Sequence, residues 1–264
     1  MATVNEIYHY LDGRAPFSLQ MDFDNSGFLV GRGEAPVQRV MVALDITQEV
    51  IEEAILADCE LIVSHHPIIF RPAKSVTDGG LVGKCLLALA EHHIAAICAH
   101  TNLDVAAGGV NDALAQALGL SQTELLHQDG VDPQGRPYGI GRIGTVTGFE
   151  SAREFAAFVQ KQLGAEGLRL ENAGKPVHKV AVGGGACGEY MVEAAKKGCD
   201  TFVTADVKYN TFLDARALGL NLIDGGHFST ENVVCPILAQ WLTEGFPNLE
   251  VQISKVHKEV FSCI

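Results

Sequence analysis

The sequence predicts an α/β fold of three layers, with helices on both faces of a sheet. Short, continuously apolar runs alternate with helical patterns, and several of these runs end at a polar or charged residue. Such runs are typical of buried parallel strands, and their alternation with helices implies right-handed crossovers. In addition, the order of strands, helices and motifs in the first part of the chain recurs in the second. We therefore expect two related halves.

The expected elements begin at the N-terminus with a capping box. Thr3-x-x-Glu6 predicts a helix to about Leu11, and a loop rich in Asp, Asn and Gly follows at 22–33. The elements expected next are strand 40–44, a helix to about 57 capped by Thr47, strand 61–63, helix 81–91, strand 94–99, helix 110–118, a connection dense in Gly, Pro and Asp at 129–139, strand 140–146, and a helix to about 163 capped by Ser151.

The second half repeats the first at the level of whole motifs. Segments 40–66 and 180–206 each contain a Val-rich strand, a helix with Glu-Ala, and a Cys beside an acidic residue before the next strand. The third strand is then followed by His-x-x-x-Asp in the first half and by His-x-x-x-Glu in the second. This agreement predicts an internal duplication. We expect the halves to be 1–128 and 129–264, with the functional site between them.

The composition narrows the classes of function. Apolar residues make up 47% of the 264, and 19 Lys and Arg face 32 Asp and Glu, which gives a net charge of −13. This balance argues against a nucleic-acid partner, because phosphate neutralisation needs clustered basic residues. A phosphorylated small substrate stays possible if metal ions supply local positive charge.

The cysteines and the hydropathy indicate a cellular location. The seven cysteines are scattered, odd in number and never spaced C-x-x-C, so we expect no disulfide framework and a reducing cytoplasm. No stretch approaches the roughly 18 consecutive apolar residues of a membrane helix, and the N-terminus lacks the pattern of a signal peptide. We therefore expect a cytoplasmic protein without a membrane partner.

Metal-competent side chains follow three of the expected strands directly. They come in three pairs: His65 with His66, His100 with Asp104, and His227 with Glu231. Residues just past the carboxyl ends of strands in an open α/β sheet face the crevice where ligands bind. Imidazole and carboxylate groups together are ligands for zinc, iron or manganese. The sequence therefore predicts a metal site there.

The spacing allows two ions. His65 and His66 are adjacent, so on an extended segment they point to opposite sides and can serve different ions or flank one position between two ions. Asp104 and Glu231 are candidates to bridge two cations. Other interpretations remain open, since a His-His pair is often a surface or core feature and a His-x-x-x-acid motif can cap a helix.

Further polar motifs carry weaker signals. His92 and His93 lie at a helix end, where the helix dipole explains them. We expect the remaining histidines to be solvated, namely His9, His127, His178 and His257. The glycine-rich run 183–188 opens a helix after a strand, and it suits a tight turn and an anion-binding turn equally well.

These motifs together resemble the dinuclear-metal-centre hexameric family (Nif-three-like proteins), often named GTP cyclohydrolase I type 2 homologs. The matching segments are Asp24-Asn25-Ser26-Gly27 with Val30-Gly31, Ala43-Leu44-Asp45, Ser64-His65-His66-Pro67, Ala99-His100-Thr101-Asn102-Leu103-Asp104, Gly108-Gly109-Val110-Asn111-Asp112 and Gly226-His227-x-x-x-Glu231. They occur in the expected order through nearly the whole chain. Two departures are Ala205, which stands where the family usually has Gly, and Asn210, which stands where a His is common after Lys-Tyr.

The resemblance implies a site and an assembly. It implies an α/β/α fold, a homohexamer with inward-facing sites, and two divalent metal ions per chain held by His65, His66, Asp104, His227 and Glu231. It implies no other cofactor, and it leaves His100 near the metals as a candidate catalytic acid or base, or as a group that orients a ligand. The expected function is metal-dependent hydrolysis of a nucleotide-like or phosphorylated small molecule. The alternative is a non-enzymatic ring that stores metal or scaffolds a protein partner.

Overall fold

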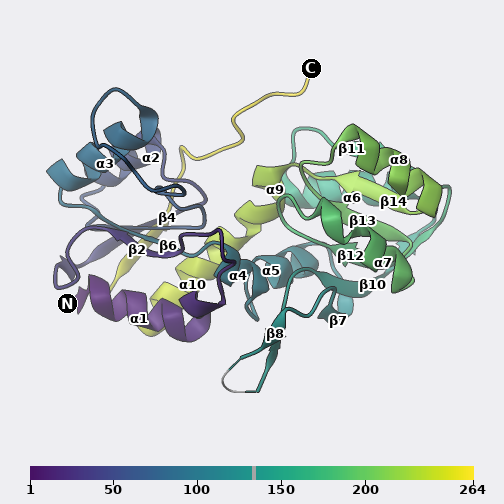
Figure 1. The fold of residues 1–264 in the computed structure, drawn as a ribbon, viewed down its shortest axis with the longest axis horizontal. Helices are drawn as coiled ribbons and strands as arrows, with labels where there is room; N and C mark the ends of the chain where they lie inside the picture. The colour runs from purple at the N-terminus through teal and green to yellow at the C-terminus, as the bar shows by residue number, and fades with distance from the viewer. Residues whose placement is uncertain (133–134) are drawn as a thin grey trace. The chain divides into compact units, whose positions relative to one another are not determined.

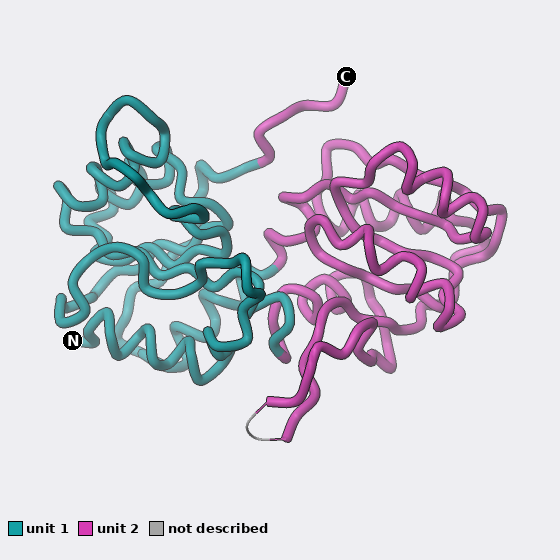
Figure 2. Tube along the Cα trace, viewed as in Figure 1, with its two compact units in different colours: residues 1–106, 234–258 teal, residues 107–233, 259–264 magenta. Residues whose placement is uncertain are grey.

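The computed structural model describes residues 1–132 and 135–264, which form two compact units (Figures 1 and 2). Unit 1 consists of residues 1–106 and 234–258, and unit 2 of residues 107–233 and 259–264. The expected division into halves at residue 128 stays a prediction. In the expected connection 129–139, residues 133 and 134 lie outside the described residues, and on either side of them β8 (Gly130–Val131) pairs with β9 (Pro137–Tyr138).

Unit 1 is built on a five-stranded sheet. Its strand order is β15 (Glu250–Ile253), β4 (Arg39–Ala43), β5 (Leu61–Ser64), β6 (Ala95–Cys98) and β2 (Gly27–Val30). All neighbours are parallel except β2, which runs antiparallel to β6. Val40, Leu61 and Ala95 lie side by side across the three central strands, so these strands end at the same edge. A separate two-stranded ladder joins β1 (Ala2–Thr3) to β3 (Pro36–Val37).

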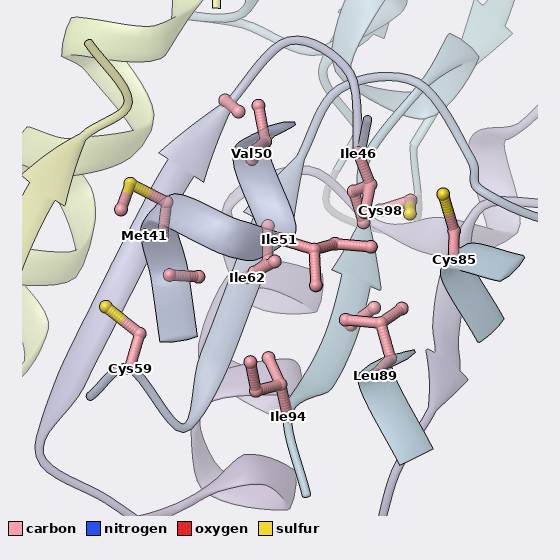
Figure 3. Close-up of a cluster of buried hydrophobic side chains, with 13 residues drawn as sticks. Met41, Ile46, Val50, Ile51, Cys59, Ile62, Cys85, Leu89, Ile94 and Cys98 are labelled. Carbon is pink, nitrogen blue, oxygen red and sulfur yellow. The ribbon is translucent and has the colours of Figure 1, made fainter. Parts of the chain in front are cut away.

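Helices cover both faces of this sheet (Figure 1). On one face, α2 (Gln48–Leu56) and α3 (Leu81–Glu91) pack on the strands through a buried cluster that includes Met41, Ile51, Ile62 and Leu89 (Figure 3). On the other lie α1 (Val4–Arg14) and α10 (Cys235–Gly245), joined by an Arg14–Glu244 ion pair of 2.9 Å. The predicted caps are confirmed, because Thr3 forms a complete capping box with Glu6 and Thr47 caps α2.

Unit 2 contains a six-stranded mixed sheet. Its strand order is β11 (Arg169–Glu171), β14 (Asn221–Asp224), β13 (Thr201–Thr204), β12 (Val177–Val182), β10 (Arg142–Phe149) and β7 (Ser121–Leu125). The neighbours β12, β13 and β14 are parallel, and the other pairs are antiparallel. Val180, Thr201 and Asn221 stand side by side, as Val40, Leu61 and Ala95 do in unit 1. Each unit therefore has the same block of three parallel strands, as expected for a duplication.

The helices of unit 2 also form two layers (Figure 1). One face is covered by α5 (Val110–Ala117) and α6 (Ala152–Leu163), whose Phe155 is fully buried in the core with Val180 and Ile223. The opposite face carries α7 (Met191–Lys196) and α8 (Tyr209–Leu218). Ser151 caps α6 as predicted. The α/β/α fold class is thus confirmed, and no helix in the described part of the chain is long and apolar enough to cross a membrane.

Candidate metal centre

Three imidazoles meet at the carboxyl edge of the unit 1 sheet. His65 and His66 come directly after β5, and His100 comes two residues after β6, as the N-cap of the short helix α4 (Thr101–Val105). Because Ser64 at the end of β5 pairs with Cys98 at the end of β6, the residues beyond them are held together. The ring centroids lie 5.0 to 5.4 Å apart, and one nitrogen from each ring lies within 4.8 Å of the others. This spacing is compatible with a shared metal ion.

His65 is fully buried and has a defined tautomer. Its Nδ1 lies 2.8 Å from the carbonyl oxygen of Ala99, which can only accept, so Nδ1 carries the proton and Nε2 the lone pair. The Nε2 atom lies 3.6 Å from Oδ1 of Asp104 on α4. Two ligand atoms bound tetrahedrally at zinc distances are about 3.4 Å apart. The pair therefore fits a cation between them better than a direct hydrogen bond.

His66 is held through Asp45, which follows β4. Its Nδ1 lies 2.7 Å from Oδ1 of Asp45, so its Nε2 is again the candidate ligand nitrogen. The other oxygen of Asp45 lies 3.0 Å from Nε2 of His257. Burial raises the pKa of Asp45, but hydrogen bonds from the two imidazoles outweigh it and keep the pKa below its usual range. The expectation that His257 is solvated was wrong, since its side chain is only 6% exposed.

His100 is oriented in the same way by Asp24. Its Nδ1 lies 2.7 Å from Oδ1 of Asp24. The second oxygen of Asp24 accepts from Ser26 Oγ at 2.8 Å and from the backbone N–H and hydroxyl of Thr101, at 3.0 and 2.5 Å. Burial raises the pKa of Asp24, but hydrogen bonds from His100, Thr101 and Ser26 have the larger effect. The net result is a pKa well below the usual range of an aspartate. Asp24 is therefore an ionised carboxylate with both oxygens committed.

Unit 2 presents one histidine and one carboxylate from α9 (His227–Glu231), the short helix after β14. One helical turn separates the two residues, and Nε2 of His227 lies 3.0 Å from Oε2 of Glu231. The Nδ1 atom of His227 lies 2.8 Å from Oδ2 of Asp206, which comes two residues after β13. Asp206 has a left-handed backbone with φ of +52°, a conformation that non-glycine residues adopt mostly at special sites.

The glycine-rich run forms a tight turn against Glu231. The N–H of Gly184 donates to Asn111 Oδ1 and that of Gly185 to Thr230 Oγ1, both at 3.0 Å. A Cβ on Gly185 would lie 2.0 Å from Oε1 of Glu231, so only glycine leaves room for this carboxylate. Because these N–H groups are already used inside the protein, the geometry favours the structural interpretation of the run over anion binding.

One pattern unites the four histidines of these clusters. In each of them, Nδ1 is hydrogen-bonded to an oxygen, so Nε2 is the candidate nitrogen for binding an ion or a proton; the oxygens belong to Ala99, Asp45, Asp24 and Asp206. Metal-binding histidines in proteins are typically oriented in this way. Sequence reasoning did not assign a role to the three aspartates. Asp45 and Asp206 each come two residues after a strand, so the strand-end rule that selected the histidines could have found them.

The structure thus groups the expected residues within each unit. His65, His66, His100 and Asp104 come together in unit 1, and His227 and Glu231 come together in unit 2. That the two groups serve the same ions stays a prediction.

Known proteins are similar to this chain over its whole length. It matches the family described as Duf34/NIF3 (NGG1p interacting factor 3) over residues 2–260. It is 32% identical over 263 residues to the GTP cyclohydrolase 1 type 2 homolog of Clostridium perfringens, and the matched region covers 99% of each chain. The protein of the same name from Streptomyces coelicolor is 36% identical over 248 residues, covering 92% of this chain and 87% of the relative. A solved Bacillus cereus protein related to NIF3 superposes with a TM-score of 0.94 at 28% identity, covering 100% of this chain and 99% of the other.

Proposed function

Because the chain belongs to the Duf34/NIF3 family, we propose that it is a dinuclear metal protein that catalyses hydrolysis. The proposed ligands of two divalent ions, zinc, iron or manganese, are His65, His66, Asp104, His227 and Glu231. The observation that carries the proposal is the shared orientation of the histidines, each with Nδ1 hydrogen-bonded to an oxygen, which makes Nε2 the candidate ligand atom. The 3.6 Å between His65 Nε2 and Asp104 Oδ1 supports it.

In this proposal His100 moves a proton. A bound divalent ion would supply Lewis acidity and would lower the pKa of water towards neutrality. Since Asp24 holds the Nδ1 proton of His100, the Nε2 lone pair is free to accept a proton from the attacking water or to return one to a leaving group. The ionised Asp24 would then stabilise the imidazolium, as the aspartate of a catalytic triad does. The other proposed role, orientation of a ligand, remains the competing one.

We propose a nucleotide-like or phosphorylated small molecule as the substrate. Two relatives carry the name GTP cyclohydrolase 1 type 2 homolog, which suggests this class. A net charge of −13 makes the chain itself a poor receptor for anions, so bound cations would have to meet the charge of such a substrate.

The proposed assembly is a cytoplasmic homohexamer with its sites facing inward. Closed symmetric rings are a common form of soluble oligomer. Light scattering at micromolar concentration should give six times the mass of the chain. A mass of one or two chains would contradict the hexamer without affecting the proposed chemistry.

Elemental analysis tests the metal proposal directly. Protein purified without chelator should contain two equivalents of divalent metal per chain, and His65→Ala and His227→Ala should each lose metal. His9 is exposed on α1 and lies far from the proposed ligands in the sequence. His9→Ala is therefore the matched control and should keep both ions. Metal-loaded protein should then be assayed against a panel of nucleotides and phosphoesters. Two bound ions with no turnover of any compound would favour the metal-storing or scaffolding alternative.

A further inference from the structure

The segment after β15 reaches the candidate metal centre through His257. Ser254 Oγ donates to the carboxylate of Glu53 on α2, and it accepts the backbone N–H of His257 at 3.2 Å. These contacts turn the segment inward. The His257 side chain is consequently buried, whereas the preceding residue, Val256, is 44% exposed. A buried imidazole between the exposed residues Val256 and Lys258 needs a hydrogen-bond partner, and one such partner is Asp45.

Asp45 lies between two imidazoles. Its Oδ1 accepts from His66 Nδ1 at 2.7 Å, and its Oδ2 accepts from His257 Nε2 at 3.0 Å. With both oxygens engaged, the carboxylate cannot rotate without breaking one of the bonds. The Asp45 side chain is 41% exposed, so water would replace His257 if that ring were absent, and the carboxylate would be free to turn.

We infer that His257 is a positioning residue that acts through Asp45 to hold the Nε2 atom of His66 in its ligand orientation. The role rests on the proposed function of His66 as a metal ligand. It makes the segment 254–257 part of the metal centre, although that segment contributes no ligand of its own. Outer partners of metal-binding histidines contribute about 10- to 100-fold to metal affinity.

The test compares His257→Ala with His257→Gln in the full-length protein. Zinc affinity is measured by competition with a chelator. Because His257 acts one hydrogen bond further from the ion than Asp45, the alanine variant should bind zinc about 10-fold less tightly, the lower end of the range for outer partners. The glutamine amide can still donate to Asp45, so this variant should keep most of the affinity. His9→Ala again serves as the control.

A double substitution distinguishes positioning of His66 from a general structural role of His257. In His66→Ala protein, adding His257→Ala should cause no further loss of zinc affinity, because the ring that His257 positions is gone. An equal loss with and without His66, or equal losses for the alanine and glutamine variants, would overturn the inference.

A readout without metal keeps this inference distinct from the proposed function. Nitrogen-15 spectra of histidine-labelled, metal-free protein should show the His66 proton on Nδ1 in the native chain and in His257→Gln. In His257→Ala the two tautomers should be mixed. If the native protein bound no metal, the proposed function would fail while these spectra still decided the role of His257. An unchanged His66 tautomer in His257→Ala would refute that role.

Discussion

The carboxylate of Asp24 and the imidazole of His100 lie 2.7 Å apart between Oδ1 and Nδ1, and the Asp24 side chain is completely buried. The other Asp24 oxygen accepts from Ser26 Oγ and from two groups of Thr101, so the carboxylate has one fixed orientation. An acceptor fixed in this way determines which nitrogen of His100 carries the proton. The pair therefore has the arrangement of a base and the group that orients it.

Replacing His100 distinguishes a proton-transfer residue from a ligand. We expect His100→Ala to retain two metal equivalents per chain, while hydrolytic activity falls by about 10²-fold or more, the usual contribution of general acid–base catalysis. Elemental analysis and turnover are measured on the same preparation. If one metal equivalent disappears, His100 is a ligand, and its proposed catalytic role must be abandoned.

Asp24→Asn tests the orientation of that base without removing it. Three groups of Thr101 and Ser26 donate to the Oδ2 position, whereas the Asn25 N–H donates to Oδ1 beside His100. The amide oxygen should therefore take the Oδ2 position, and the amide NH₂ then faces Nδ1 of His100. His100 would have to accept at Nδ1 and carry its proton on Nε2, so it could no longer act as a base. We expect activity to fall by about 10²-fold or more with metal content unchanged. Activity close to that of the native protein would show that the His100 tautomer does not matter.

Much of the fold follows from local sequence patterns. The strand–helix alternation, the caps at Thr3, Thr47 and Ser151, and the helix Leu81–Glu91 are confirmed in the structure. These signals are local, because they depend on apolar runs and on side chains within three residues of a helix start.

The elements that sequence analysis missed include the outer strands of the two sheets. They are β2, β7, β11 and β15. β2 falls in the segment 22–33 that was expected to be a loop, and β7 has four exposed residues out of five. Such strands form because a neighbouring strand offers unpaired backbone groups, and their own side chains carry little apolar pattern. Their positions are therefore fixed by tertiary pairing and cannot be predicted from the segment alone.

The candidate site likewise combines residues that local patterns reveal with contacts that only the tertiary structure creates. The histidines stand out because they come one to three residues after apolar strands, but their partners are residues that lie far away in the sequence. Asp24 contacts a residue 76 positions away, and His257 contacts one 212 positions away. His257 was expected to be solvated for this reason, since its neighbours in the sequence show no metal-like pattern.

The cysteines give a prediction for chemical reactivity. Burial raises the pKa of the Cys98 and Cys199 thiols to about 11 and that of Cys235 to about 12. A raised pKa means less of the reactive thiolate at a given pH, so these thiols should react slowly at pH 8. Cys263 is exposed, and titration of native protein with a thiol reagent should show one fast equivalent per chain. Cys263→Ser should remove that fast phase, and a second fast equivalent in native protein would contradict the burial of the other six.

The last prediction concerns the contact between Gly185 and Glu231. Gly185 has a φ of +62°, and so does Gly164 at the C-terminus of α6, where an added Cβ would meet nothing within 4 Å. Alanine at either position should cost about 1–2 kcal/mol of unfolding free energy for the left-handed backbone. Only at Gly185 would the new Cβ displace the Glu231 carboxylate, whose Oε1 lies 2.0 Å from that position.

Gly185→Ala and Gly164→Ala should therefore have similar thermal stabilities and different metal contents. The Glu231 oxygen is the far end of a flexible side chain, so it can move aside without unfolding the protein, but it then leaves its place as a ligand. Calorimetry of metal-free protein measures the first effect, and elemental analysis with chelator competition measures the second. If Gly185→Ala binds metal as tightly as Gly164→Ala, then either Glu231 is not a ligand or the turn does not hold it in place. Glu231→Gln distinguishes these two explanations. If that variant loses metal, Glu231 is a ligand, and only the role proposed for the turn is wrong.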